Sequence, residues 1–323
     1  GDTTIETLEI DRGHWRATNT SRKVLACYNP DACLGGVSRE LNYCSAGYEG
    51  PYCSICSEGY SPGLGYNCRK CSGSSGSIVV TVTIFVSAIA TVILLVCCLI
   101  RGKLTCGDGG LLTSMKRRLL SLKIVIIVWQ VTTQFATVTN VMYPGLYQEF
   151  LEGVDVLNFD LGWIVSAECI IDLDFHDRLM VSTLGPSVAL AILGGMYAMA
   201  MQRNRAAQDV FPVTAQDDVR QKYLSLVLLL TILVYTSVSS TLFRMFACDE
   251  LDDGKSYLRA DYRIDCNSPR HIWLQVYAGC MMIFYTGGVP ALYGILLFRN
   301  RQALTNDGAR QEHAGAKSIS NLW

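Results

Sequence analysis

Cysteines are the residues of this chain whose type and spacing could do chemistry. The chain has 14 of them, and seven lie in one short stretch: Cys27, Cys33, Cys44, Cys53, Cys56, Cys68 and Cys71. Paired as disulfides, they would constrain a segment that is too small to be stabilised by an apolar core alone. Alternatively, the last four form two pairs, each separated by two residues, which is a spacing typical of four-cysteine zinc sites.

Whether these cysteines form disulfides or bind zinc depends on the cellular compartment, and the apolar runs of the chain predict that compartment. Residues 77–100 form a run of 24 residues without a charge. Because a helix of about 20 apolar residues crosses a bilayer core of about 30 Å, we predict a membrane span there. Four more runs qualify, about Leu119–Val141, Met180–Gln202, Tyr223–Ala247 and Ile272–Phe298. The composition, 50% hydrophobic and 17% charged, also favours a membrane protein.

The distribution of Lys and Arg predicts the orientation of these spans. Six basic residues lie in segment 101–123, and others lie in 203–222 and in the tail. Segment 143–178 has Arg178 as its single basic residue among many acids. Since cytoplasmic loops are rich in Lys and Arg, we expect the N-terminus outside and the C-terminus in the cytoplasm. The expected location is the plasma membrane, or another surface membrane such as a flagellar one.

This orientation places ten cysteines on the outer side, because Cys169, Cys248 and Cys266 join the first seven. An oxidising compartment favours disulfides over zinc. The seven N-terminal cysteines are odd in number, so Cys169 is the expected eighth partner. Cys248 and Cys266 bracket a 17-residue outer loop, and a bridge between them would join the outer ends of the last two spans.

The cysteine stretch resembles a known kind of extracellular module. Its middle reads Cys-x8-Cys-x2-Cys from residue 44 to residue 56, with Gly-Tyr-Glu-Gly-Pro at 47–51. This pattern is similar to EGF and laminin-EGF repeats and to the ephrin-receptor-like cysteine module. By that resemblance Cys44 pairs with Cys53, and Cys56 pairs with Cys68 or Cys71.

The wider chain resembles large multipass membrane proteins of algae, oomycetes and other protists. The shared pattern includes Gly-His-Trp-Arg at 13–16, Ala-Cys-Leu-Gly-Gly at 32–36 and Gly-Val-Pro-Ala-Leu-Tyr at 288–293. In those proteins such a module precedes a bundle described as TRP-channel-like. The resemblance implies an all-α polytopic membrane bundle of about five transmembrane helices. A small disulfide-rich EGF/laminin-like extracellular module would precede that bundle.

We divide the chain into four parts. Residues 1–26 are an extracellular segment, which we expect to be the end of a preceding domain, since the chain starts at Gly1 as a mature or partial form would. Residues 27–76 form the cysteine-rich module, 77–298 the transmembrane bundle with five helices, and 299–323 a cytoplasmic tail. Asn19 begins an Asn-Thr-Ser glycosylation sequon on the outer side, which predicts a glycoprotein.

Polar residues inside the predicted spans need partners. The second run carries a stripe on one helical face: Gln130, Thr133, Gln134, Thr137 and Asn140. Because lipid does not accept such a stripe, it either bonds neighbouring helices or lines a path for an ion or solute. In the fourth run, Arg244 either extends to the outer surface or pairs with Asp172 or Asp174.

The fifth run contains a helix-disturbing sequence at Gly287, Gly288 and Pro290. Proline cannot donate a hydrogen bond to the carbonyl of Thr286, and the glycines allow the backbone to bend. We therefore predict a kink of more than about 20° between Thr286 and Pro290. We expect the freed carbonyl to meet water or a polar side chain of the Gln130 stripe.

Enzyme motifs are absent from the sequence: it has no phosphate-binding loop, no His-Glu-x-x-His motif and no Gly-x-Ser-x-Gly elbow. A net charge of −1 gives no reason to expect a nucleic-acid partner. We expect no cofactor and no bound metal, and we expect lipid and an extracellular protein partner or larger assembly as surroundings. The expected function is a non-enzymatic cell-surface receptor or the membrane-anchoring end of a larger extracellular protein. The alternative is an ion channel or channel subunit of TRP-like type, which would form an oligomer around a pore.

Overall fold

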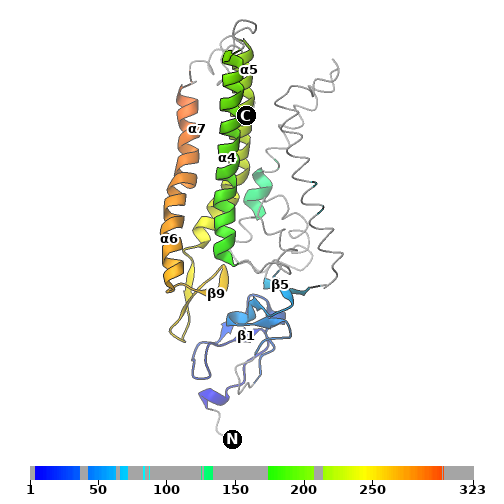
Figure 1. Ribbon diagram of the computed structural model, residues 1–323. Coiled ribbons are helices and arrows are strands. Elements are labelled where there is room, and N and C mark those ends of the chain that lie inside the picture. Colours follow the sequence, from blue (N-terminus) through cyan, green and yellow to red (C-terminus); the bar gives the residue numbers. More distant parts are fainter. Residues whose placement is uncertain are drawn as a thin grey trace. The chain divides into compact units, whose positions relative to one another are not determined.

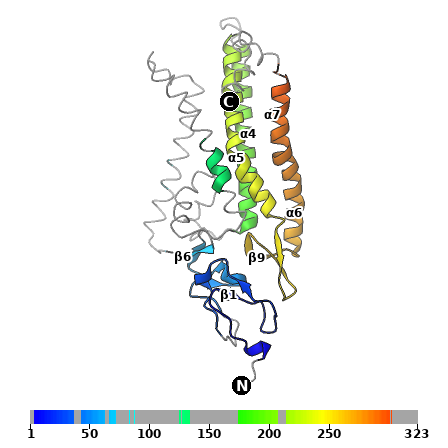
Figure 2. The ribbon, with the colours of Figure 1, turned by 180° about the vertical axis from the view of Figure 1, so that it is seen from behind.

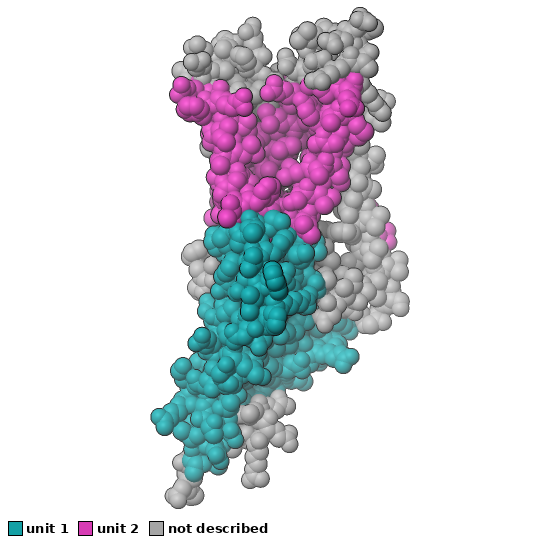
Figure 3. All heavy atoms as spheres, turned by 60° about the vertical axis from the view of Figure 1, so that its left-hand side comes forward, with its two compact units in different colours: residues 1–81, 132–181, 240–282 teal, residues 82–131, 182–239, 283–323 magenta. Residues whose placement is uncertain are grey.

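The computed structural model describes residues 4–36, 43–62, 66–71, 127–133, 174–206 and 214–299, together with the single residues 83, 87, 125 and 301. The chain divides into two compact units, coloured separately in Figure 3. Unit 1 comprises residues 1–81, 132–181 and 240–282. Unit 2 comprises residues 82–131, 182–239 and 283–323.

Three long helical stretches dominate the described residues (Figure 1; Figure 2). They are α4 (Phe175–Ala206), α5 (Thr214–Arg244) and the succession of α6 (Pro269–Met282), η7 (Ile283–Gly287) and α7 (Gly288–Arg299). Within them, segments Phe175–Gln202, Val219–Arg244 and Pro269–Arg299 are long and apolar enough to cross a membrane, with mean hydropathies of 1.7, 2.0 and 1.6. These confirm the third, fourth and fifth predicted spans.

The first two predicted spans fall almost wholly outside the described part of the chain. Of the run 77–100 only Thr83 and Ser87 are described, and of the second run only residue 125 and residues 127–133. All of these are helical. The structure thus has three candidate spans, and the number five stays a prediction.

The ends of the three observed helices differ from the predicted ends for a physical reason. α4 begins at Phe175 rather than Met180, and α5 begins at Thr214 rather than Tyr223. The added turns are polar, so hydropathy does not detect them, although polar residues can continue a helix beyond its apolar part. α5 ends at Arg244 rather than Ala247, because the chain turns there into a strand that starts at Cys248.

The N-terminal cysteine region of unit 1 is built from small sheets and short 3-10 turns. Three antiparallel pairs form its sheets: β1 (His14–Trp15) with β2 (Leu25–Ala26), β3 (Tyr48–Glu49) with β4 (Ile55–Cys56), and β5 (Tyr60–Pro62) with β6 (Cys68–Lys70). The 3-10 turns are η1 (Ile5–Thr7), η2 (Pro30–Ala32) and η3 (Pro51–Cys53). Pairs this short are not stable alone, so cross-links must hold them.

Disulfides supply those cross-links. The structure pairs Cys27 with Cys33, Cys44 with Cys53, and Cys56 with Cys68, at Cα separations of 6.5, 5.3 and 5.4 Å. The zinc alternative is therefore wrong, since three of its four sulfurs are bonded to other sulfurs. Cys71 is disulfide-bonded as well. The prediction that Cys169 is the eighth partner of the module concerns a residue beyond the described part of the chain.

Residues before the first cysteine fold together with the cysteines. Ile10 and Trp15 belong to the same buried cluster as Cys27 and Cys33. Arg16 is 1% exposed and ties the first residues down, because its guanidinium donates to the main-chain carbonyl of Ile5 at 2.7 Å. Residues 4–36, 43–62 and 66–71 are called the cysteine module below.

A three-stranded antiparallel sheet joins α5 to α6, also within unit 1. It consists of β7 (Cys248–Glu250), β8 (Ser256–Leu258) and β9 (Asp261–Asp265), in the order β7-β8-β9. Tyr262 and Ile264 of β9 are buried, while Arg263 and Asp265 are exposed, as a half-buried strand requires. The sequence predicts only a loop here. We call these strands the outer sheet.

Polar side chains bond the helices of unit 2 to one another. Gln130 is fully buried, donates to the carbonyl of Leu233 at 3.0 Å and accepts from Thr236 at 3.2 Å. Tyr285 donates to the carbonyl of Thr183 at 2.7 Å, and Tyr293 donates to that of Leu228 at 2.7 Å. The bonds of Gln130 support the helix-bonding role predicted for the stripe. Gln134, Thr137 and Asn140 fall outside the described residues.

The predicted disturbance of the last helix takes the form of a π-helical turn. η7 occupies Ile283–Gly287, and Gly288 and Pro290 follow it in the first turn of α7. The predicted bend angle stays a prediction. Gln130 bonds to α5, and the contact of the Thr286 carbonyl with water or the stripe stays a prediction. The hydroxyl of Thr286 donates to that of Ser239 at 3.4 Å.

Candidate functional site

The cysteine module and the outer sheet, about 200 residues apart in the chain, meet within unit 1. Ser21 donates to Asp252 at 2.8 Å, and Lys23 lies 3.2 Å from the other oxygen of that carboxylate. Tyr66 donates to the carbonyl of Arg259 at 3.2 Å. Leu251 of the β7–β8 connection is 7% exposed and belongs to the buried cluster of the module. We call this set of interactions the docking contact.

Aromatic rings fill the centre of the docking contact. The ring centroid of Tyr28 lies 4.7 Å from that of Tyr66, 5.0 Å from that of Tyr52 and 6.1 Å from that of Tyr262. Tyr52 also lies 5.3 Å from Tyr262 and 5.4 Å from Trp15. Aromatic pairs of this kind contribute about 0.5–1.5 kcal/mol each beyond the burial of their area. The cluster therefore joins the module and the outer sheet into one packed body.

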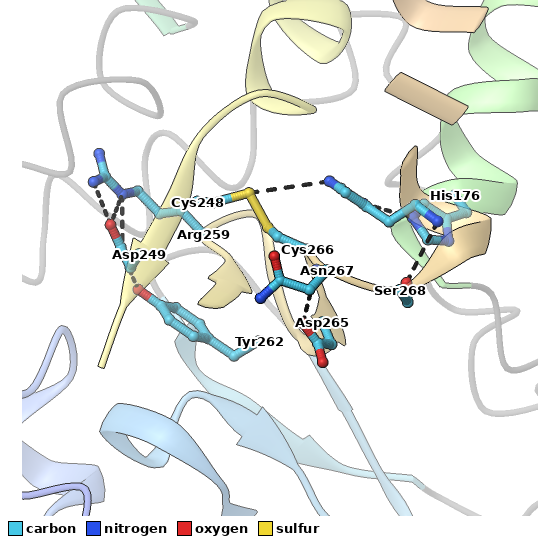
Figure 4. Close-up of a disulfide and its surroundings, with 10 residues drawn as sticks. His176, Cys248, Asp249, Arg259, Tyr262, Asp265, Cys266, Asn267 and Ser268 are labelled. Atoms are coloured by element: carbon cyan, nitrogen blue, oxygen red, sulfur yellow. Dashed lines mark hydrogen bonds and ion pairs between the residues drawn. A yellow bond between two sulfur atoms is a disulfide. The ribbon is translucent and has the colours of Figure 1, made fainter. Parts of the chain in front are cut away.

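The carboxylate of Asp249 in β7 bonds to Tyr262 of the aromatic cluster and to Arg259 (Figure 4). The guanidinium of Arg259 donates from Nε to both oxygens of Asp249, at 3.1 and 3.2 Å. Tyr262 donates to Asp249 at 2.6 Å, and its oxygen lies 2.9 Å from that of Tyr28. Burial by itself would raise the pKa of Asp249, but the hydrogen bonds from Arg259 and Tyr262 lower this pKa below its ordinary value. Asp249 therefore stays ionised and holds the Tyr262 hydroxyl in place.

Three tyrosine hydroxyls of the docking contact, those of Tyr52, Tyr66 and Tyr262, stay neutral under physiological conditions. Burial and the neighbouring Tyr28 raise the pKa of Tyr52 to about 12. The same two causes raise the pKa of Tyr66 to about 12. Burial, followed by the hydrogen bond to Asp249, also raises the pKa of Tyr262. The hydroxyls of Tyr52, Tyr66 and Tyr262 thus keep their protons, and none of these three has the lowered pKa that would indicate an activated group.

Backbone strain accompanies the docking contact. Among the described residues, three that are not glycine have positive φ: Tyr52 at 57°, Cys53 at 51° and Tyr66 at 60°. A left-handed conformation costs a residue with a side chain about 1–2 kcal/mol. Two of the three are tyrosines of the aromatic cluster, so the module accepts strain to aim these rings at the outer sheet.

A disulfide between Cys248 and Cys266 closes the outer sheet, with a Cα separation of 6.5 Å (Figure 4). It joins the first residue of β7 to the residue after β9, as the bracketing of the loop predicts. Ligand atoms of Cys248, Cys266 and His271 all lie within 4.8 Å of one another, and these residue types could hold a zinc ion. The two sulfurs are bonded to each other, so they offer no thiolate to a metal.

Two contacts join the first turns of α4 and α6. Nε2 of His176 lies 3.1 Å from Nδ1 of His271. Arg270 lies 3.1 Å from Asp174 and 3.4 Å from Asp177. Nothing in the sequence relates these residues, because they are about 95 positions apart and belong to no motif. Only tertiary packing, which brings the starts of α4 and α6 together, could have revealed them.

Of the environments predicted for Arg244, a pairing with Asp174 differs from what the structure shows. Asp174 pairs with Arg270 rather than with Arg244, and Asp172 is not among the described residues. Burial raises the pKa of Asp174, and its hydrogen bond with Asp177 raises it further. The positive charge of Arg244 acts on Tyr66, whose pKa it lowers in opposition to burial. Arg244 therefore lies near the docking contact, at the C-terminal end of α5.

Asn19 is exposed in the cysteine module, as a glycosylated asparagine must be. The hydroxyl of Ser21, the third residue of the sequon, is bonded to Asp252 in the folded chain. Attachment of a glycan stays a prediction.

No protein-family model matches the chain, and neither a curated protein nor a solved structure is significantly similar to it. The structure agrees with the expected order of parts: a disulfide-rich region of small strands comes first, and three long apolar helices follow. This order defines the class of the protein. It is a membrane protein with a disulfide-rich N-terminal region of the kind found in extracellular and luminal domains.

Proposed function

We propose that the protein is a non-enzymatic surface receptor, or the membrane-anchoring end of a larger extracellular assembly. The observation that carries this proposal is the docking contact. A module on a flexible tether moves independently of the membrane helices. Here the module is packed onto the outer sheet, which continues directly into α5 and α6, so a ligand or a pulling force on the module acts on both helices.

The polar contacts of the helices support an anchor rather than a pore. The polar groups of Gln130, Tyr285 and Tyr293 form hydrogen bonds with carbonyls and hydroxyls of neighbouring helices. Side chains that line a wet path would direct those groups toward water instead. An EGF-like character of the module, an extracellular N-terminus and a plasma-membrane location all belong to this proposal.

The π-turn η7 favours the alternative, a channel subunit of TRP-like type. Turns of this kind inside α-helices occur often at functional sites. In this alternative η7 is a hinge, and several copies of the chain surround a pore.

Two measurements on the full chain separate these functions. With the chain expressed on intact cells, external protease should cleave within the module or the outer sheet and spare the tail 301–323. In planar bilayers the purified chain should carry no ion current. On cells, the surface level of the Pro290→Ala variant should match that of the wild type. A conductance that changes with Pro290→Ala would contradict the anchor and support the channel. Removal of the tail by external protease would overturn the orientation.

A further inference from the structure

The contact between His176 and His271 has features that helix packing alone does not require. His176 is the second residue of α4, and His271 is the third residue of α6. Their ring centroids are 5.3 Å apart. The two residues are 3% and 0% exposed, so both rings are buried. A pair of titratable groups is thus enclosed where two helices begin.

The neighbouring contacts assign the protons of the pair. Nε2 of His271 lies 4.0 Å from the sulfur of Cys248, which as part of a disulfide can only accept a hydrogen bond. With Nε2 protonated, Nδ1 of neutral His271 is an acceptor, so His176 donates to it from its own Nε2. Nδ1 of His176 is then unprotonated and buried, and it has no hydrogen-bond partner in the described part of the chain.

We propose that this contact is a proton-sensitive latch between α4 and α6, with Nδ1 of His176 as the atom that takes up the proton. A proton there creates a charged ring and a new N–H that has no hydrogen-bond partner among the described residues. Both a buried charge and a buried unsatisfied donor cost free energy. A second proton, on Nδ1 of His271, removes the acceptor and breaks the bond between the rings. Acid therefore weakens the latch in two steps.

The carboxylates of β9 that face the pair are already engaged. Asp261 pairs with Arg263 at 2.9 Å and accepts from the main-chain N–H of Phe175 at 3.3 Å. Asp265 accepts from the main-chain N–H of Asn267 at 2.8 Å. These groups lessen the cost of a charged imidazole, but they do not touch Nδ1 of His176.

The charges at the starts of α4 and α6 disfavour a positively charged imidazole between them. Asp174 and Asp177 of the α4 start share the single guanidinium of Arg270 from α6. Arg270 adjoins His271 in the chain and repels a second positive charge near it. Both rings also lie in the first turn of a helix, where the partial positive charge of free N–H groups disfavours a cation. Repulsion from Arg270 and from the two helix ends thus adds to the cost of burial.

The latch would respond in mildly acidic surroundings. Histidine is the side chain whose ordinary titration falls between about pH 5 and 8. Contact with Cys248 connects the pair to the outer sheet, so its opening is transmitted to the element that carries the cysteine module.

The test uses the full chain in lipid nanodiscs and the variant His176→Gln. Glutamine offers an N–H donor where Nε2 was, but it cannot take up a proton. Amide hydrogen exchange is followed over residues 178–184 and 272–278 near pH 7.5 and near pH 5.5, with correction for intrinsic rates. The wild-type chain should lose protection at the lower pH, whereas His176→Gln should keep it. His14→Gln, which changes a histidine of the module, is the matched control and should behave like the wild type.

Two results would overturn the latch: no loss of protection in the wild type, or an equal loss in His176→Gln. If the variant does not fold, ring NMR signals of the wild-type histidines provide the decision. Protonation of His176 must then accompany the loss of protection. Loss of protection while the ring stays neutral, or protonation without any loss, also contradicts the proposal.

Discussion

Replacing Cys248 and Cys266 together by serine is expected to lower the free energy of unfolding by about 3 kcal/mol. The bridge closes a loop with a sequence separation of 18 residues, and breaking it gives the unfolded chain more freedom. The bridge also holds β7 and the end of β9 together, and with them Asp249 and Tyr262. The effect should therefore reach the docking contact, beyond the loop itself.

The disulfide prediction is checked by denaturant or thermal unfolding of the purified chain in detergent. Cys280→Ser is the matched control, because Cys280 is a free, exposed cysteine of α6. Such a surface change should alter stability by less than about 0.5 kcal/mol. Equal stability of the double variant and the control would show that the bridge does not support the outer sheet.

Tyr262→Ala is expected to cost about 3–5 kcal/mol, the range for truncation of a buried aromatic side chain. Tyr262 is 2% exposed and contacts both Tyr52 and Tyr28 across the docking contact. Tyr262→Phe should cost about 1–3 kcal/mol, because it keeps the ring but leaves Asp249 without its hydroxyl donor. Both variants should make the cysteine module easier to cleave by protease while α4 and α5 stay helical.

The control for this series is Tyr60→Phe, which removes the hydroxyl of a half-buried tyrosine in β5 of the module. Its stability and protease resistance should match those of the wild type. If Tyr262→Phe behaves as Tyr60→Phe does, the hydroxyl bonded to Asp249 contributes nothing to docking.

Length and composition predicted the membrane helices because a bilayer imposes a simple requirement on the sequence. A run such as 272–298 must be apolar and about 20 residues long, wherever its neighbours lie. The bridge between Cys248 and Cys266 was equally accessible, since two outer cysteines bracket one loop. The pairing of Cys44 with Cys53 followed from a resemblance of the module and could not be obtained from spacing alone.

The docking contact could not be predicted, because no local pattern encodes it. Tyr28 and Tyr262 are 234 positions apart and form their bond only after both parts have folded. The acids at 249–253 suggest a solvated loop, yet Asp249 is enclosed by Arg259 and Tyr262. The positive φ angles of Tyr52 and Tyr66 are likewise a product of tertiary packing, since neither residue type favours them.

For the polar residues of the helices, the sequence predicted burial but not the bonding partners. The stripe that includes Gln130 indicated that this face avoids lipid, and Gln130 is buried. Its partners, the carbonyl of Leu233 and the hydroxyl of Thr236, depend on how the helices pack. The tyrosines at 285 and 293 were missed because a single hydroxyl on an aromatic ring hardly alters the hydropathy of a span.

Docking of the cysteine module on the outer sheet is the central claim, and carbodiimide cross-linking of the wild-type chain tests it most directly. The amine of Lys23 lies 3.2 Å from a carboxylate oxygen of Asp252, and the Lys23 side chain is 71% exposed to reagent. Mass spectrometry of the reduced, digested chain should find an amide bond between Lys23 and Asp252. That bond should be missing from Lys23→Arg, which keeps the charge without the reactive amine. Lys23 joined mainly to carboxylates outside residues 248–266, or to none, would contradict the docked module.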